Sequence, residues 1–190
     1  MEEGKARELG YPTDIVVRTY VKTAVEPFPQ LLIAPAIAIS KALDRAGLKL
    51  DDIDLFEIHE AFAAQVLSTL KVLASKEYSK QSKTMEKQFQ SLKAHSRSVL
   101  HKDEPVGVIP LSKINVNGGY VFVRTSRDQL VYKFIIRSIA IGHPFAATGG
   151  RLVASATNEL RRSKKRFCLI SICAAGGIGG VMILERRFPG

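Results

Sequence analysis

Apolar residues recur along the chain with two different spacings, which predict alternating strands and helices. The β-branched run at 14–21 predicts a strand. Apolar positions at helical spacing over 36–46 predict a helix that ends at Gly47, since glycine is common just past a helix C-terminus. The alternating segment 53–58 predicts a second strand, which runs straight into a helix over 59–73.

The second half of the chain continues this arrangement. Residues 114–117 predict a short strand, and residues 146–160 predict a helix. Two further strands are expected at 167–173 and 181–185, separated by the glycine-rich segment 174–180. The order strand, helix, strand, helix, helix, strand, strand predicts an α/β layered sheet.

Length and composition are those of one ordinary domain. The chain has 190 residues, of which 46% are hydrophobic and 24% charged, so a disordered or fibrous class is excluded. No apolar run approaches the roughly 18 residues of a membrane span. Its two cysteines cannot form a disulfide framework, and a reduced, intracellular setting is expected. No targeting signal is visible at the N-terminus.

A net charge of +10 raises the question of a nucleic-acid partner. The segment 75–102 holds seven bases against two acids, and the segment 120–137 holds four bases against one acid, so the rest of the chain is nearly neutral. Both segments look like inserts between better-patterned regions, with bounds of about 75–104 and 120–137. Basic inserts are usually solvated surface, so no nucleic-acid partner is expected.

Three places combine a reactive side chain with backbone amides at the end of an element. His143 precedes a predicted helix whose dipole disfavours the charged imidazole, which suits a general base. Cys173 ends a strand and is followed by glycines whose amides can converge on an anion. His59 lies at a junction between strand and helix, with Glu60 beside it.

Each of these places also has a plain structural interpretation. A histidine before a helix is often a structural hydrogen-bonding group, a cysteine at a strand end is often a small buried apolar residue, and glycines between strands often form a turn. A metal site made of His59, His143 and Cys173 is not supported by their spacing, so no metal is expected.

Four motifs in this order resemble the C-terminal half of a thiolase. They are HEAFAAQ at 59–65, NVNGG at 115–119, GHPFAATG at 142–149 and CAAGG at 173–177, with KALDRAGL at 41–48 upstream. The first and last of the four are most similar to the β-subunit branch of the fatty-acid trifunctional enzyme. The resemblance implies a thiolase C-terminal domain over residues 1–190, folded as a βαβαββ layer with the two inserts.

The resemblance also implies an activity and a set of site residues. Thiolases transfer acyl groups between a 3-ketoacyl-CoA and coenzyme A, which is a co-substrate and not a bound cofactor. His143 would activate a nucleophilic thiol, Cys173 would act as the acid and base at the substrate α-carbon, and His59 would orient an oxyanion-hole water. The amides of Ala175 and Gly176 would form a second oxyanion hole, and a low pKa is expected for Cys173 beside these glycines. The supporting loop would be Asn117, Gly118 and Gly119.

The chain also departs from the family pattern. The cysteine that the family acylates lies in the N-terminal half, which is absent here, and Cys168 is expected to face away from Cys173 across the sheet. We therefore expect the chain to be inactive alone, to expose a large apolar face, and to pair with a thiolase N-terminal half or with itself. The alternatives are a non-catalytic interaction module and a truncated or mispredicted fragment. The resemblance suggests a mitochondrial location.

The insert at 120–137 decides whether the site can form. A hairpin over these residues would loop out and leave Gly119 beside Ser138. Without such a hairpin, His143 would lose its position relative to Asn117, and translated intron sequence is the alternative origin of the segment.

Overall fold

The structure is a computed structural model that describes residues 1–80, 104–123, 132–136 and 138–188. At its centre lies a four-stranded mixed sheet with the strand order β1-β6-β5-β2. Strand β2 runs parallel to β5, whereas β6 is antiparallel to both of its neighbours. The strands are β1 (Ile15–Ala24), β2 (Leu55–Ile58), β5 (Phe167–Ala174) and β6 (Ile178–Arg186). These are the four main predicted strands, and the expected α/β class is confirmed.

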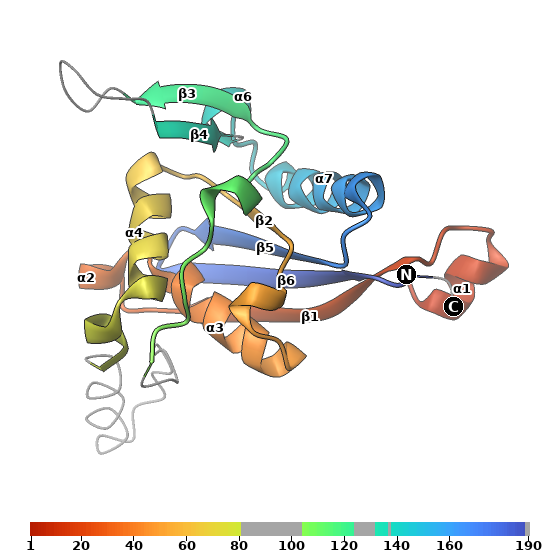
Figure 1. Ribbon diagram of the computed structural model, residues 1–190, viewed down its shortest axis with the longest axis horizontal. Coiled ribbons are helices and arrows are strands. Elements are labelled where there is room, and N and C mark those ends of the chain that lie inside the picture. The colour runs from red at the N-terminus through yellow and green to blue at the C-terminus, as the bar shows by residue number, and fades with distance from the viewer. Residues whose placement is uncertain (81–103, 124–131, 137, 189–190) are drawn as a thin grey trace.

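Helices cover both faces of this sheet (Figure 1). Helix α3 (Ala34–Ala46) packs on β1 and β6, and α4 (Ala63–Ala74) shares one apolar cluster with it. Helix α7 (Ala147–Ser163) lies on the opposite face, against β5. Gly47 ends α3 in the left-handed conformation, with φ of 68°, as predicted.

The central strand β5 contributes alternate side chains to two separate cores. Leu169 belongs to the cluster on the α3 side, whereas Cys168 and Ile170 pack with α7. Since side chains alternate along a strand, Cys173 faces the same side as Leu169. The prediction that the two cysteines point to opposite faces is therefore confirmed, and Cys168 is fully buried among apolar side chains.

Short elements complete the description of the fold. They are the helices α1 (Glu3–Glu8), α2 (Pro27–Gln30) and α6 (Ser138–Ile141), the single turns η1 (Leu50–Asp52) and η2 (Leu111–Lys113), and the strands β3 (Gly119–Val123) and β4 (Tyr132–Ile136). The predicted polar insert at 75–104 falls mostly outside the described residues; its beginning, 76–80, is helical.

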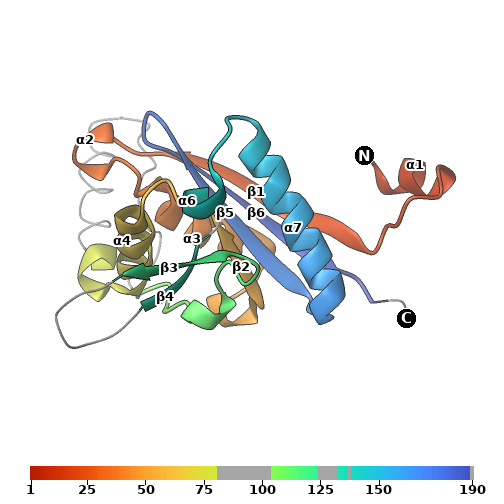
Figure 2. The ribbon, with the colours of Figure 1, turned by 90° about the horizontal axis from the view of Figure 1, so that it is seen from above.

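The second insert forms the hairpin that would keep the site together. Strands β3 and β4 pair antiparallel, with Gly119 opposite Ile136, and stand outside the main sheet on the side that carries α6 (Figures 1 and 2). This cross-strand pair brings the end of the Asn-Gly-Gly segment next to the start of α6 at Ser138. The inserted length therefore does not separate the segments on its two sides.

Two predicted elements are wrong in detail. Residues 114–117 form no strand: Ile114 makes one bridge to Phe56, and Asn115 then adopts a left-handed conformation with φ of 48°. A left-handed residue cannot continue a ladder, so the chain turns away from β2 at this point. The helix expected from residue 59 begins only at Ala63, because the backbone of His59 continues the pairing with β5 instead.

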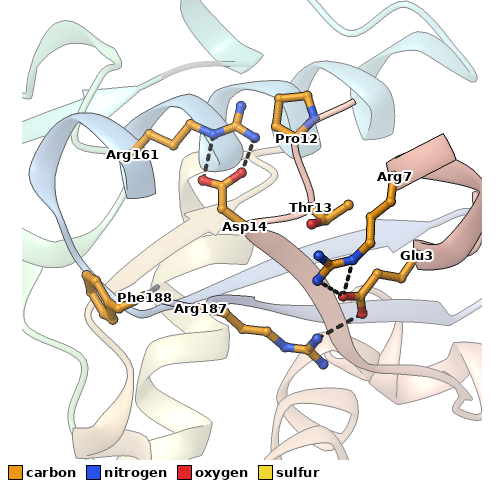
Figure 3. Close-up of a pocket in the computed structure, with 8 residues that line it drawn as sticks. All are labelled: Glu3, Arg7, Pro12, Thr13, Asp14, Arg161, Arg187 and Phe188. Atoms are coloured by element: carbon orange, nitrogen blue, oxygen red, sulfur yellow. Dashed lines mark hydrogen bonds and ion pairs between the residues drawn. The ribbon is translucent and has the colours of Figure 1, made fainter. Parts of the chain in front are cut away.

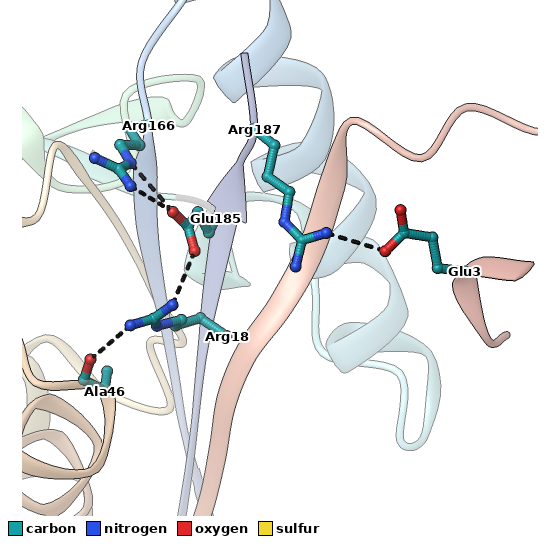
Figure 4. Close-up of polar contacts among 6 residues, drawn as sticks. All are labelled: Glu3, Arg18, Ala46, Arg166, Glu185 and Arg187. Atoms are coloured by element: carbon teal, nitrogen blue, oxygen red, sulfur yellow. Dashed lines mark hydrogen bonds and ion pairs between the residues drawn. The ribbon is translucent and has the colours of Figure 1, made fainter. Parts of the chain in front are cut away.

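A buried carboxylate links neighbouring strands at the end of the sheet opposite the β5–β6 turn. The Glu185 side chain on β6 accepts hydrogen bonds from Arg166, which directly precedes β5, and from Arg18 on β1 (Figure 4). Arg18 lies where the register of β1 with β6 shifts, and it also donates to the carbonyl of Ala46 at the end of α3. Because one carboxylate on β6 meets an arginine on β1 and another just before β5, these three strands are held together at this end.

Helix α3 approaches β6 too closely for any side chain on one strand residue. A Cβ on Gly179 would lie 2.6 Å from the carbonyl carbon of Ala34 and 2.7 Å from the nitrogen of Pro35. A Cβ on the next residue, Gly180, would find its nearest neighbour at 3.9 Å, the hydroxyl oxygen of Tyr20. There is therefore no room for a side chain at position 179, where α3 packs against the strand, whereas there is room for one at position 180.

Candidate active site

His59 lies directly after β2 and is almost wholly buried. Its backbone N–H donates to the carbonyl of Ser171 at 2.8 Å, which extends the β2–β5 pairing by one residue. Its ring Nδ1 lies 2.9 Å from Oγ of Ser138 on α6. His59 is therefore held by the sheet through its backbone and by α6 through its ring.

His143 lies in the loop between α6 and α7, and its hydrogen bonds define its tautomer. The single hydroxyl proton of Thr148 is donated to the carbonyl of Pro144 at 3.1 Å. Thr148 Oγ1 must then accept from Nδ1 of His143, 2.7 Å away. The proton of the neutral ring consequently sits on Nδ1, and Nε2 carries the lone pair. An exposed imidazole with a free Nε2 is the form that a general base requires.

The two imidazoles meet in the folded chain. Their ring centroids are 4.1 Å apart, although 83 intervening residues separate them in the sequence. Burial, together with the nearby His143 and Arg151, which act in the same direction, lowers the pKa of His59 to about 4. His59 is therefore neutral at pH 7 and can act there as a hydrogen-bonding group, not as a cation.

Cys173 lies close to the loop that follows His59, but its thiol does not have the expected low pKa. Burial raises the pKa of the Cys173 thiol, and hydrogen bonds from its own amide and from the amide of Ala61 only partly oppose this. The contact with Ala61 places the sulfur beside the segment that carries His59. The expectation of a lowered pKa is wrong, because the thiol is buried and its pKa is set chiefly by loss of water.

The glycines after Cys173 form a turn. Ala175, Gly176 and Gly177 connect β5 to β6, with positive φ at both glycines, and Ala175 and Gly176 are exposed. The plain interpretation as a hairpin turn is thus correct. The use of the Ala175 and Gly176 amides as an oxyanion hole stays a prediction.

Asn115, which the sequence did not single out from its motif, reaches the candidate site. Its side-chain oxygen accepts from the Ile58 amide at 2.7 Å, and its side-chain nitrogen donates to the Ile58 carbonyl at 3.0 Å. It also donates to the buried carboxylate of Glu60, which accepts from the amide of Ile139 on α6. Asn115 and Glu60 thereby tie the end of β2 to α6, and so fix the backbone on both sides of His59.

The expected supporting loop lies partly elsewhere. Asn117 donates to Glu159 at 2.7 Å, far along α7 from its first turn. The amide of Gly118 donates to the carbonyl of Asn115, and Gly119 starts β3. Asn117 therefore anchors the loop to α7, whereas Asn115 is the residue that touches the site.

Two hollows on the surface of the fold are not lined by His59 or His143. A groove of about 330 Å³ runs beside α7 over β5, β6 and β1, and its lining is mainly apolar. Tyr20 and Ile178 line it and stay 47% and 43% exposed, because α7 covers only part of this sheet face (Figure 2). This groove is a small exposed apolar surface beside α7, and the large apolar face expected from the sequence stays a prediction.

The second hollow lies where the two chain ends meet, and it has a volume of about 680 Å³. Its arginines are paired with carboxylates: Arg161 with Asp14, and both Arg7 and Arg187 with Glu3 (Figure 3). Because each of these three guanidinium groups is paired with a carboxylate, the cavity is not a candidate site for an anion.

The parts of the chain that the structure describes contain no group of three His, Cys, Asp or Glu side chains able to hold a metal. None of the helices within those parts is long and apolar enough to cross a membrane.

Comparison with known proteins identifies the family. The chain matches the family described as thiolase, C-terminal domain, over residues 12–123 and 136–186. It belongs to the thiolase family. The match is interrupted at residues 124–135, which follow β3 and include most of β4. The proposed bounds of the inserts stay predictions.

Relatives of this thiolase domain are considerably longer. It is 39% identical over 185 residues to a 3-ketoacyl-CoA thiolase of Cronobacter sakazakii and 37% identical to one of Shewanella amazonensis, covering 97% of this chain and 34% of each relative. An acetyl-CoA acetyltransferase of Bacillus anthracis is similar with a TM-score of 0.64 and 28% identity, covering 98% of this chain and 34% of that one. One from Syntrophomonas wolfei has a TM-score of 0.68 and 25% identity, covering 99% and 36%. The chain spans about a third of their length.

These relatives are bacterial, so they do not support the mitochondrial location suggested by the resemblance. Their names likewise do not distinguish the trifunctional-enzyme branch, which stays a prediction.

The low pKa of His59 makes the stability of the thiolase domain depend on pH. In the unfolded chain, His59 is protonated below its ordinary pKa of 6.5, whereas in the folded chain it stays neutral down to about pH 4. Between these two pH values the unfolded state binds more protons, so acid favours unfolding. We expect the free energy of unfolding to fall by about 2 kcal/mol between pH 7 and pH 5. Urea titrations at both pH values measure this difference. His59→Gln should remove most of the pH dependence, and an unchanged dependence would contradict the assignment.

Proposed function

We propose that this thiolase domain contributes His143, Cys173 and His59 to acyl transfer between a 3-ketoacyl-CoA and coenzyme A, giving acyl-CoA and acetyl-CoA. The observation that carries the proposal is the contact of two imidazoles at 4.1 Å, one with a free Nε2, beside the loop that touches the Cys173 thiol. The trifunctional-enzyme branch is part of this proposal, on the HEAF and CAAGG motifs.

The proposed roles follow the protonation states. Nε2 of His143 takes the proton of an attacking cysteine thiol, whose sulfur adds to the C3 carbonyl of the substrate. The bond between C2 and C3 then breaks, and the electron pair stays on the acetyl-CoA carbon. Cys173 gives its proton to that carbon; a thiol whose pKa is raised by burial holds this proton at neutral pH. Coenzyme A then attacks the acyl-cysteine thioester and gives its thiol proton to the Cys173 thiolate. Acyl-CoA leaves, and the departing cysteine sulfur takes its proton back from His143. Neutral His59 orients a water that stabilises the thioester oxygen.

The acylated cysteine has to come from outside the 190 residues. The chain has two cysteines, and Cys168 is fully buried in the apolar cluster under α7. We propose that the missing part of a thiolase supplies the nucleophile and docks on the apolar groove beside α7, where Tyr20 and Ile178 are exposed. Coenzyme A thioesters would be substrates, with no bound cofactor.

A complementation experiment tests this proposal. The chain alone should show no thiolysis of acetoacetyl-CoA, because it lacks the nucleophile. Mixing it with the part of the Cronobacter sakazakii relative that it does not cover should restore activity, followed as loss of the enolate absorbance.

The matched control is Ile178→Asp, which places a charge in the apolar groove and should prevent docking and restoration. Activity of the chain alone that Cys173→Ala abolishes would contradict the need for a partner. Binding of the partner without activity would instead favour the non-catalytic interaction module.

A further inference from the structure

One arginine connects both histidine-bearing segments. Nη2 of Arg151, in the first turns of α7, donates to Oγ of Ser138 at 3.0 Å, and the same oxygen lies 2.9 Å from Nδ1 of His59. Nη1 of Arg151 donates to the carbonyl of Gly142 at 3.0 Å, on the peptide that leads into His143. The two terminal nitrogens of one planar group thus reach the hydrogen-bond partner of the His59 ring and the peptide bond that precedes His143.

We infer that Arg151 is a positioning residue that sets the distance between His59 and His143, with Ser138 as its link to His59. This inference rests on the proposed function for its meaning, since the spacing of the two rings matters only if both act on one substrate. Without Arg151, the Gly142 carbonyl and the Ser138 hydroxyl would have no shared donor. The exposed loop around His143 could then move relative to the buried ring of His59.

Arginine is suited to this position for a geometric reason. Its guanidinium is rigid and presents several donors in a fixed plane, whereas the lysine ammonium is a point charge on a flexible stem. A lysine at position 151 would keep the positive charge but would not hold both acceptors at a fixed separation. A comparison of Arg151→Lys with Arg151→Gln therefore separates the effect of the positive charge from the effect of the hydrogen-bond geometry.

The charge of Arg151 acts on His59 together with several other groups. His143 and Arg151 both disfavour a proton on His59, the Glu60 carboxylate lies on the adjacent residue, and the neutral thiol of Cys173 lies near the following loop. Because Arg151→Lys keeps the positive charge and Arg151→Gln removes it, the difference in the His59 midpoint between these two variants reports the charge at position 151.

Proton NMR of the full chain tests the inference without substrate or partner. The four histidines are assigned by replacing each in turn, and two readouts follow: the through-space signal between the rings of His59 and His143, and their titration midpoints. In Arg151→Gln we expect loss of the ring-to-ring signal and an upward shift of the His59 midpoint. In Arg151→Lys we expect the signal to weaken while the midpoint stays near that of the original chain.

Control variants make each outcome decisive. Lys165→Gln removes a charge beyond the other end of α7 and should change neither readout. Ser138→Ala should alter the Nδ1 resonance of His59 and leave the contact between Arg151 and the His143 loop. An unchanged ring-to-ring signal in Arg151→Gln, or in Arg151→Lys if the glutamine variant does not fold, would overturn the inference. Neither readout involves catalysis. The inference about Arg151 can therefore fail while the proposed acyl transfer stands, and the proposed acyl transfer can fail while the inference stands.

Discussion

Replacing His143 by alanine in the complemented thiolase is expected to lower kcat/KM for acetoacetyl-CoA by about 10²–10⁴-fold, the usual contribution of a general base. The reason is that Nε2 of His143 is the free basic nitrogen of the pair, since Thr148 fixes the proton on Nδ1. His59 cannot replace it, because its ring is buried and its Nδ1 already contacts Ser138. Steady-state kinetics with purified partners measure the loss.

Thr148→Val provides the matched test of the tautomer. This variant keeps the shape of the side chain but removes the acceptor for Nδ1, so both tautomers of His143 become accessible and kcat should fall by less than in His143→Ala. The pH profile should also change, since the base is no longer oriented by one hydrogen bond. Full activity of His143→Ala in the mixture would exclude it as the base.

Gly179→Ala is expected to lower the free energy of unfolding by about 3 kcal/mol, at the upper end of the cost of overpacking. The added methyl group would meet backbone atoms of Ala34 and Pro35 at 2.6–2.8 Å, so either β6 or the start of α3 has to move. Backbone atoms in a packed helix cannot rotate away as a flexible side chain can. Urea titration followed by circular dichroism measures the change.

The neighbouring glycine gives the control. Gly180→Ala adds the same methyl group one residue further along β6, where the nearest atom is 3.9 Å away, and should change stability by less than about 0.5 kcal/mol. Equal effects of the two substitutions would show that strand propensity, and not contact with α3, decides the cost.

The main elements could be predicted from the sequence because each carries its own local signal. The helix before Gly47 and the strand at 167–173 follow from periodicity and glycine placement, and the structure agrees with them closely. The last strand begins at Ile178, three residues earlier than predicted, because Gly179 and Gly180 belong to the strand and not to the turn. The failure at 114–117 has a different origin. Its residues look like a strand, but the Asn115 side chain takes over the backbone partners at the end of β2, which is a tertiary contact without a local pattern.

The site was predictable to a similar extent. His59, His143 and Cys173 stand out as reactive residues at element ends, and the structure brings the first two into contact. Ser138, Thr148 and Arg151 carry no such signal, since a serine, a threonine and an arginine at these positions look like ordinary helix residues. The pKa of Cys173 could not be predicted either, because it depends on how deeply the thiol is buried.

The pairing of Gly119 with Ile136 has a practical consequence for protein engineering. Facing residues of antiparallel strands lie only about 5 Å apart, so the chain leaves the domain and returns to it at nearly the same point. A sequence inserted between β3 and β4 should therefore not strain the rest of the molecule. The sequence between these two strands is therefore a suitable position for grafting an affinity tag or a fluorescent reporter.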